Sequence, residues 1–486
     1  MKEYTIYGIL LLALLLRLYH IDFPVGGWHD WRQADTAAMA RNFYENGFNL
    51  FYPQIDWGGN SSGLVESEFP IYPFVVSILY QLFGVNDIWG RILSVLFSLT
   101  TIYGLYLLTK KYLSKKAALW ATFIYAIIPS NIYFGRAFMP ESAMLMCSVL
   151  GIYWFALWLE SSRTRDFILA VAFVSLAALL KIPALYLGLP LLFLARLRFQ
   201  SNTFKTKTLW LFALLVLVPV VAWYYHAHQL FLQYGLSFGI WGFGTDKWGN
   251  FDIILTSQFY NRILFQSIAE RHLTYAGFLI FFFGLFLKRK SSEEKLFDYW
   301  LLAILIYFLI VAKGNQAHDY YQLPFILPAV AYIGKVFDKY VQTDSIRHLF
   351  RTKPLIHALL ALCLIVILTL SYLRYDLFMN YYETYDASLF RLASAVQSST
   401  KKNDLVVAVS ESNPIVLYRC NRKGWNSSPE ELNLTFLNDK KNKGAKFLIG
   451  ETHFFNRKNR QGILDIIFSN YTLVEKGADY FIIQLH

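Results

Sequence analysis

Residues 354–374 read PLIHALLALCLIVILTLSYLR, an apolar run as long as a membrane-spanning helix. Such a helix needs roughly 20 mostly apolar residues to cross the hydrocarbon core of a bilayer. Comparable runs precede it along the chain, at residues 4–20, 91–109, 117–135, 142–160, 166–181, 183–196, 208–226, 274–288, 298–313 and 322–336. The sequence therefore predicts an all-α polytopic transmembrane fold with about eleven spans.

The composition agrees with a membrane protein. Of the 486 residues, 56% are hydrophobic and only 16% are charged, whereas soluble domains carry closer to about 25% charged residues. The net charge of +12 would suit a nucleic-acid partner, but the basic residues lie in short loops between apolar runs. That placement is typical of cytoplasmic loops, so we expect membrane lipids and no nucleic acid as partners.

The placement of charge also predicts the orientation. If the N-terminus lies inside, the loops that carry most of the lysines and arginines are cytoplasmic, as the positive-inside tendency requires. These loops comprise residues 110–116, 161–165, 197–207, 288–297 and 337–353. We interpret the first apolar run as a retained span and not a signal peptide, because no small-residue cleavage spacing follows it.

Two domains are expected from this pattern. Residues 1–374 form the transmembrane domain, in which residues 21–90 are a long outer loop. Its stretches at 36–45 and 71–83 are too short or too polar to span, so we expect interfacial helices. The tail, residues 375–486, combines a helical pattern at 387–397 with strand-like runs at 405–409, 446–450 and 480–484. It therefore predicts a small extracytoplasmic soluble α/β domain.

The first outer loop begins with the most unusual stretch of the chain, GWHDWRQADTAAMAR at residues 27–41. It holds His29, Asp30, Arg32 and Asp35 directly after the first span. A carboxylate near a low-dielectric boundary has a raised pKa, which suits a base that deprotonates an acceptor hydroxyl. The other interpretation makes Asp35 the N-cap of a helix that begins at Thr36, and spacing alone does not decide between them.

Two further turns on the predicted outer side carry charge. Arg136 and Glu141 flank the turn between the third and fourth runs, and Lys181 lies between the fifth and sixth. Glu141 would complement the positive end of a helix, or act as a second carboxylate. Lys181 would either extend its ammonium group to the interface or hold a phosphate leaving group.

The remaining candidates surround these turns. His318 with Asp319, Tyr320 and Tyr321 forms a polar cluster that could bind a phosphate or sugar, although the two tyrosines also suit interfacial anchors. Glu68 precedes the second interfacial stretch, and Arg91 opens the second span. All of these clusters map to one predicted face of the membrane, and ionisable groups at membrane depth are usually functional.

In its order of motifs, the chain resembles bacterial membrane glycosyltransferases of the C-type superfamily. These include the lipid A aminoarabinose transferases and the dolichyl-phosphate-mannose protein mannosyltransferases. The resemblance covers about residues 1–340 and rests on HDWRQADT at 29–36, FPIYP at 69–73, Arg136 with Glu141, KIP at 181–183 and HDYYQLP at 318–324. The chain departs from the family's adjacent Asp-Glu pair in the first loop, and Glu-Phe-Pro replaces the commoner Lys-Pro-Pro.

The resemblance implies a polyprenyl-phosphate sugar donor, an extracytoplasmic lipid, glycan or protein acceptor, and inversion at the transferred sugar. It makes Asp35 or Asp30 the base, and it places Lys181, Arg136 and His318 on the donor phosphate. Glu141 would orient the acceptor, or would join Asp35 in holding a divalent metal such as Mg or Mn. Further contacts to substrate are expected from His29, Arg32, Glu68, Arg91 and Tyr320. The expected location is a bacterial inner (plasma) membrane, with the site on its extracytoplasmic face.

Other classes of protein remain open at this point. A lipid-linked glycan flippase or transporter would place charges at the bilayer midplane and often shows inverted repeats, whereas the predicted span interiors are nearly free of charge. An oligosaccharide ligase or polymerase is compatible with the large second outer loop at 227–273. A scaffold or receptor that binds through its tail would not need the acidic and basic clusters.

Overall fold

A computed structural model describes residues 4–238, 247–341, 354–376, 387–457, 460 and 462–485. The chain divides into two compact units, each assembled from separated stretches of sequence. The first, which we call the helical unit, comprises residues 1–21, 91–226 and 243–381. The second, the sheet unit, comprises residues 22–90, 227–242 and 382–486.

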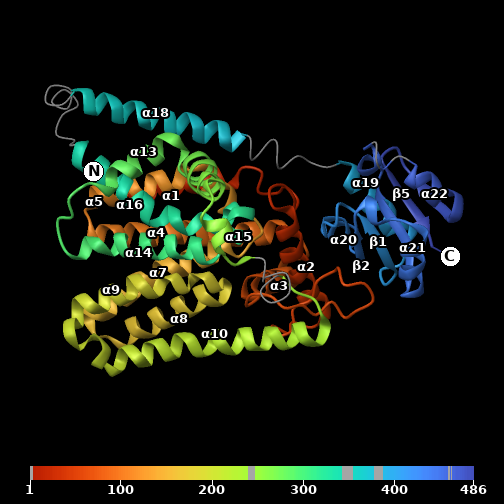
Figure 1. Ribbon diagram of the computed structural model, residues 1–486, viewed down its shortest axis with the longest axis horizontal. Coiled ribbons are helices and arrows are strands. Elements are labelled where there is room, and N and C mark those ends of the chain that lie inside the picture. Colours follow the sequence, from red (N-terminus) through yellow and green to blue (C-terminus); the bar gives the residue numbers. More distant parts are fainter. Residues whose placement is uncertain are drawn as a thin grey trace. The chain divides into compact units, whose positions relative to one another are not determined.

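Every apolar run predicted from the sequence is helical (Figure 1). The helices are α1 (Thr5–Leu18), α4 (Ile88–Tyr112), α5 (Lys115–Ile127), α6 (Pro129–Phe134), α7 (Glu141–Ser161), α8 (Thr164–Leu180), η1 (Ile182–Leu187), α9 (Gly188–Phe199), η2 (Gln200–Lys205), α10 (Lys207–Tyr234), α13 (Thr274–Leu285), α14 (Leu296–Ile310), α16 (Leu323–Tyr340) and α18 (Pro354–Asp376). Among the described residues, 5 helices are long and apolar enough to cross a membrane by length and composition. The chain is an integral membrane protein, and the count of about eleven spans stays a prediction.

Shorter elements connect these helices. They are α11 (Phe251–Ile254), α12 (Ser257–Tyr260), the π-helix η4 (Asn261–His272), η5 (Glu293–Lys295), α15 (Ala312–Ala317) and η6 (Asp319–Gln322). Within the helical unit, α7 packs against α8 and α5 packs against α16. The predicted span at 117–135 is in fact two helices, because Pro129 lacks the N–H that would continue α5, and Ile128 is extended.

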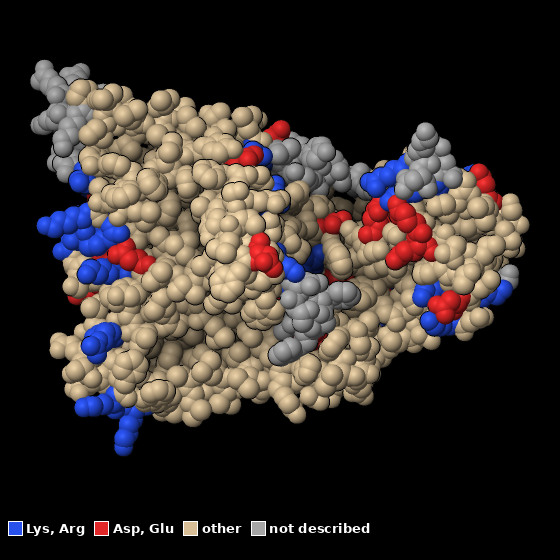
Figure 2. Space-filling model, viewed as in Figure 1, with Lys and Arg blue, Asp and Glu red and all other residues tan. Residues whose placement is uncertain are grey.

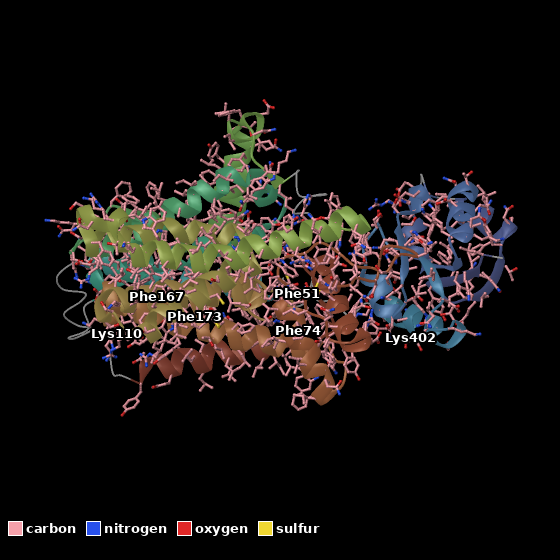
Figure 3. All side chains as sticks on the ribbon, turned by 90° about the horizontal axis from the view of Figure 1, so that it is seen from below. Phe51, Phe74, Lys110, Phe167, Phe173 and Lys402 are labelled. Atoms are coloured by element: carbon pink, nitrogen blue, oxygen red, sulfur yellow. The ribbon has the colours of Figure 1, made fainter. Side chains whose placement is uncertain are left out.

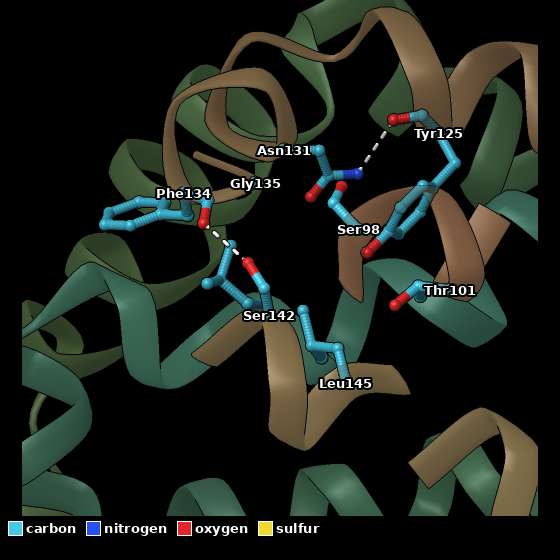
Figure 4. Close-up of a pocket in the computed structure, with 9 residues that line it drawn as sticks. Ser98, Thr101, Tyr125, Asn131, Phe134, Gly135, Ser142 and Leu145 are labelled. Carbon is cyan, nitrogen blue, oxygen red and sulfur yellow. Dashed lines mark hydrogen bonds between the residues drawn. The ribbon is translucent and has the colours of Figure 1, made fainter. Parts of the chain in front are cut away.

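The guanidinium of Arg17 compensates for this break. Arg17 is completely buried and donates to the carbonyls of Ala126 and Asn131 at 3.2 Å each, and to Oγ of Ser98 at 2.8 Å. It thereby donates to backbone carbonyls on both sides of the break, and the carbonyl of Asn131 also accepts the N–H of Gly135 at 3.0 Å. The side-chain amide of Asn131 donates to the carbonyl of Tyr125 at 3.1 Å beside a small polar cavity (Figure 4).

Basic side chains gather at one end of the helical unit, whose visible surface is otherwise almost free of charge (Figure 2). Several belong to the last turns of helices, namely Lys110 and Lys111 of α4, Arg196 and Arg198 of α9, and Lys339 of α16. Lys110 is labelled in Figure 3. Cations favour helix C-termini electrostatically, and their grouping at helix ends is the pattern from which the sequence predicts the cytoplasmic side.

The sheet unit has a five-stranded sheet in the order β2-β1-β3-β5-β4. Its strands are β1 (Leu405–Val409), β2 (Gly424–Ser427), β3 (Ala445–Glu451), β4 (Thr472–Lys476) and β5 (Tyr480–Gln484). Strands β1, β2 and β3 are parallel, whereas β5 is antiparallel to both β3 and β4. The three predicted strands and the α/β character of the tail are therefore confirmed, and β2 and β4 are strands that the sequence did not reveal.

Helices cover both faces of this sheet (Figure 1). They are α19 (Ala387–Ser399), α20 (Ile415–Cys420), α21 (Leu434–Asn442) and α22 (Ile463–Asn470), with short turns η8 (Pro429–Glu431) and η9 (Thr452–Phe455). Because strand side chains alternate, Val406 and Ala408 join the core under α19 and α20. Val407 and Val409 join the opposite core, under α21 and α22.

The first outer loop belongs to the same sheet unit. It forms α2 (Asp30–Asn46) and α3 (Ile71–Phe83), and the second helix has the bounds that the sequence predicts. The ring of Phe74 (labelled in Figure 3) lies edge-on to that of Phe43, with ring centroids 5.5 Å apart, and joins the two helices. Since α2 begins at Asp30 with His29 as its N-cap, the interpretation of Asp35 as an N-cap is wrong.

Candidate functional site

Asp35 lies inside α2 and is almost completely buried, at 3% exposure. Each of its carboxylate oxygens accepts an indole N–H: Trp31 donates to Oδ2 at 2.8 Å, and Trp57 donates to Oδ1 at 2.9 Å. Trp31 is one helical turn away on α2, whereas Trp57 comes from the loop that follows the helix. Two donors from different elements fix the plane of the carboxylate, which a base requires for a defined direction of attack.

Burial raises the pKa of Asp35 to about 7, against the opposing effects of the two indole hydrogen bonds and the charge of Arg32. The nearby charge of Asp56 raises the pKa of Asp35 further. A carboxyl with a pKa near 7 exchanges its proton at neutral pH, whereas an ordinary aspartate is already fully ionised and only weakly basic. The arrangement can therefore take a proton from a hydroxyl.

Asp30, the alternative base, has different surroundings at the start of α2. Its Oδ2 accepts a hydrogen bond from the side-chain amide of Asn413 in the tail at 2.8 Å, and its Oδ1 accepts the backbone N–H of Trp31 at 2.7 Å. Burial raises the pKa of Asp30, although both hydrogen bonds oppose that effect. His29 precedes it with a left-handed backbone, at φ 57°.

Arg32 and Glu68 form an ion pair at 2.8 Å in the same unit, and the guanidinium of Arg32 lies over the ring of Phe238, 5.2 Å from its centroid. The structure thus places Arg32, Glu68, Asp30 and Asp35 in the sheet unit, and their roles toward a substrate stay predictions.

A second group lies in the helical unit. The ammonium of Lys181 is 2.9 Å from Oε1 of Glu141, and both side chains are nearly inaccessible, at 9% and 2% exposure. Glu141 is the first residue of α7, as expected for an acid at a positive helix end. Because Lys181 is buried against a carboxylate, the interpretation that it merely extends to the interface is wrong.

Aromatic rings complete this second group. Lys181 Nζ lies 5.5 Å from the ring centroid of Tyr320 and 5.6 Å from that of Tyr321, within the range of cation–π attraction. The ring of His318 is 5.3 Å from that of Tyr320. Tyr320 is buried, so the interpretation as an interfacial anchor is wrong for that residue. Glu141, Lys181, His318 and Tyr320 therefore meet although they come from three separate parts of the sequence.

Arg136 and Arg91 are both completely buried in the helical unit. Arg136 follows α6, and its Nη1 donates to the backbone carbonyl of His20 at 2.8 Å. Arg91 lies in the first turn of α4. Burying a charged guanidinium group costs free energy unless the group is paired. Their complete burial distinguishes Arg91 and Arg136 from the basic residues of the loops.

The described residues do not fit the metal that the resemblance leaves open. Among them, no group of three or more His, Cys, Asp or Glu side chains could hold an ion. We therefore derive no step through a metal.

Sequence reasoning missed the two tryptophans. Trp31 had a detectable signal, because it precedes Asp35 by four residues and such pairs are neighbours on a helix. Trp57 had none, because its contact depends on how the following loop folds back. The pairing of Lys181 with Glu141 was likewise not predicted, since 40 residues of chain separate them.

Comparisons with known proteins agree with this architecture. Residues 67–226 match the family model of dolichyl-phosphate-mannose-protein mannosyltransferases. An uncharacterised protein of Aquifex aeolicus is 25% identical over 288 residues, which is 56% of this chain and 61% of the length of that relative. The match therefore spans less than two thirds of the relative.

Solved structures share the fold over almost the whole chain. ArnT from Cupriavidus metallidurans bound to undecaprenyl phosphate matches with a TM-score of 0.70 at 14% identity, covering 100% of this chain and 99% of that one. The oligosaccharyltransferase of Archaeoglobus fulgidus in its apo form matches with a TM-score of 0.60 at 14% identity, covering 93% of this chain and 70% of that one. The predicted resemblance to C-type membrane glycosyltransferases is confirmed at the level of the fold.

Proposed function

We propose that this membrane protein transfers a sugar from a polyprenyl-phosphate-linked donor to an extracytoplasmic acceptor. The single observation that carries the proposal is the buried Asp35 carboxylate, held by two indole N–H groups in a chain with the fold of membrane glycosyltransferases. Undecaprenyl phosphate is bound in one protein of similar fold, which makes a lipid phosphate a chemically reasonable donor group here.

Asp35 is the proposed base. It takes the proton of the acceptor hydroxyl as the oxygen attacks the anomeric carbon, and the bond from that carbon to the phosphate oxygen breaks. The phosphate leaves with the electron pair of that bond, and attack from the opposite face inverts the anomeric centre. Asp30, which the amide of Asn413 already holds, is the second candidate for this role.

The leaving phosphate needs positive charge, since its negative charge grows as the bond breaks. Lys181 is the proposed contact, with Arg136 and His318 as further donors. Glu141 holds the ammonium of Lys181 in position at 2.9 Å, and the rings of Tyr320 and Tyr321 exclude water from it. Because this part of the helical unit is shielded from water, the attraction between the Lys181 ammonium and a phosphate would be stronger there than in water.

The acceptor is a lipid, a glycan or a protein on the extracytoplasmic side of a bacterial inner (plasma) membrane. Two other functions are compatible with the fold, namely an oligosaccharide ligase or polymerase and a lipid-linked glycan flippase. A ligase consumes a donor with a diphosphate or a long glycan. A flippase moves the donor across the bilayer without consuming it.

The test is donor consumption by the purified protein in vesicles that contain an extract of bacterial envelope lipids and glycans. Radiolabelled undecaprenyl-phosphate sugars are supplied, and the release of free undecaprenyl phosphate is measured. We expect release that Asp35→Asn lowers by about 10²–10⁴-fold, the usual effect of losing a general base. Asp30→Asn serves as the matched control and should lower release less.

Equal release by the wild-type protein and Asp35→Asn would contradict the assignment of Asp35 as the base. Movement of a fluorescent donor to the opposite leaflet, with no release of undecaprenyl phosphate, would instead identify a flippase. Consumption of only diphosphate-linked oligosaccharides would identify a ligase.

A further inference from the structure

We propose that the tail (residues 375–486) positions the Asp35 carboxylate through the indole of Trp57. Trp57 is then a positioning residue for the transfer reaction. The role of Trp57 in sugar transfer rests on the proposed function. Its structural basis lies entirely within the sheet unit, where the first outer loop and the tail pack together.

The backbone around Trp57 extends the sheet of the tail. Trp57 pairs in parallel with Gly424, the first residue of the edge strand β2. The carbonyl of Gly424 accepts the N–H groups of Gly58 at 3.1 Å and Gly59 at 2.8 Å, and its own N–H donates to the carbonyl of Asp56 at 3.0 Å. These bonds set the position of residue 57 relative to strands that lie more than 300 residues later in the sequence.

Two glycines at this edge have no room for a side chain. A Cβ atom added to Gly424 would lie 1.8 Å from the carbonyl oxygen of Val406, and one added to Gly59 would lie 2.2 Å from Nε1 of Trp425. Gly59 also has φ +68°, a conformation that favours glycine. Glycine at position 59 therefore lets the loop lie against the indole of Trp425 on β2, directly after the backbone bonds that hold residues 56–59 at the sheet edge.

The indole ring of Trp57 packs against two hydrophobic clusters. It contacts the core of the tail that includes Leu392 and Ile482, and it also contacts the loop cluster of Met39, Phe43, Ile55 and Val65. A rigid ring held by both clusters has little freedom to rotate. Its N–H therefore meets Oδ1 of Asp35, at 2.9 Å, in one orientation.

Charged contacts anchor the residue beside it. Asp56 pairs with the buried guanidinium of Arg41, and the amide of Asn42 donates to it at 3.0 Å. Arg41 in turn donates to the carbonyl of Tyr418 in the tail at 2.8 Å. Two charged groups thus shift the pKa of Asp35. Arg32 of the same helix, which is paired with Glu68, lowers it, and Asp56 of the loop raises it.

Removing the N–H of Trp57 has a predictable sign. The hydrogen bond from Trp57 favours the ionised carboxylate and so lowers the pKa of Asp35, which burial has raised to about 7. Without that bond, the pKa of Asp35 should rise by about one unit, because a hydrogen bond to a charged group corresponds to roughly one to two pKa units. Less of the base is then ionised at neutral pH, and the pH profile of transfer moves to higher pH.

The experiment replaces Trp57 with β-(3-benzothienyl)alanine, whose ring has the same shape but carries no N–H. The titration of Asp35 is followed by the carboxyl stretch in infrared difference spectra, with the same protein carrying Asp35→Asn as the reference. Trp57→Phe provides a second variant, and a thermal melt verifies that each variant is folded. The full-length protein in detergent or vesicles is used throughout.

A matched control breaks another contact between tail and loop. Lys402, labelled on the tail in Figure 3, pairs with Glu45 of α2 at 3.0 Å, and its side chain is 60% exposed. Lys402→Ala should leave the titration of Asp35 unchanged. Gly59→Ala adds a Cβ that would collide with the indole of Trp425 on β2 and so disturbs the loop at the sheet edge. It should change the titration of Asp35, although residue 59 makes no contact with the carboxylate.

The expected result is an upward shift of the Asp35 titration in the benzothienylalanine protein and in Trp57→Phe, with an equal displacement of the pH profile of transfer. An unchanged titration in the benzothienylalanine protein would overturn the proposal. If the titration shifts but even the wild-type protein transfers no sugar, the positioning contact stands and the proposed function fails.

Discussion

The ammonium of Lys181 lies 2.9 Å from the Oε1 atom of Glu141, and the two side chains are almost completely buried in the helical unit. A buried pair of this kind is rarely a source of stability, because desolvation of both ions offsets their attraction. The pair at the first residue of α7 is therefore a site where the proposed contact of Lys181 with the donor phosphate can be tested. The phosphate proposal and a purely structural pair make different predictions.

Replacing one member of the pair should destabilise the protein strongly. Lys181→Met leaves Glu141 buried without its cation, which typically costs about 3–5 kcal/mol. Thermal unfolding in detergent should show this loss, together with weakened binding of a polyprenyl-phosphate sugar. The double variant Lys181→Met with Glu141→Gln should recover most of the stability, because no uncompensated charge remains.

The double variant also separates stability from binding. If Lys181 contacts the donor phosphate, the double variant stays folded but loses roughly 1.5–3 kcal/mol of donor binding, the usual contribution of a hydrogen bond to a charged group. Lys181→Arg should restore only part of it, since the two cations differ in shape. Donor binding equal to that of the wild-type protein would mean that the pair is structural and that the phosphate lies elsewhere.

The pH dependence of transfer follows from Asp35. Because burial raises its pKa to about 7, the carboxyl is protonated and inactive as a base below that pH. The value of kcat/KM should fall about tenfold per pH unit below about 7 and become level above it. Initial rates across buffers of constant ionic strength measure the profile, and a plateau that extends below pH 5 would show that Asp35 is not the titrating base.

The predicted orientation can be tested with reporter fusions. The positive-inside tendency places the loop at 288–297 in the cytoplasm and the tail outside. A fusion in that loop should therefore be active only with a cytoplasmic reporter, and a fusion after residue 380 only with a periplasmic one. A cytoplasmic signal from the tail would contradict the odd number of crossings and the face on which every site residue has been placed.

Arg17 should be essential for folding, although it is outside the proposed chemistry. Its guanidinium donates to the carbonyls of Ala126 and Asn131 across the break at Pro129 and to Oγ of Ser98, and a neutral side chain removes all three hydrogen bonds from this buried region. Arg17→Leu should lower the free energy of unfolding by at least about 2 kcal/mol. Arg163→Ala, at an exposed helix end, is the control and should change stability little.

Much of the fold could be predicted from residue periodicity alone. Apolar runs of membrane length predict helices because the bilayer offers no other partner for backbone N–H and C=O groups. Short continuous apolar runs at 405–409 and 480–484 predict strands that are buried on both faces of a sheet. Strand β4 was missed because Thr472–Lys476 lies at the sheet edge with mostly exposed side chains, so its sequence lacks such an apolar run.

The candidate residues were also visible in the sequence, because clusters of charge beside apolar runs are unusual. What the sequence by itself determined was therefore the kind of protein, its helices and the residue types available for chemistry. Only the tertiary structure decided their partners. The pairing of Lys181 with Glu141, and the contact of Trp57 with Asp35 through an edge strand of the tail, depend on packing between segments far apart in the chain. The pattern of apolar and polar residues predicts which side chains are buried. It carries no information about which distant residue each buried side chain contacts.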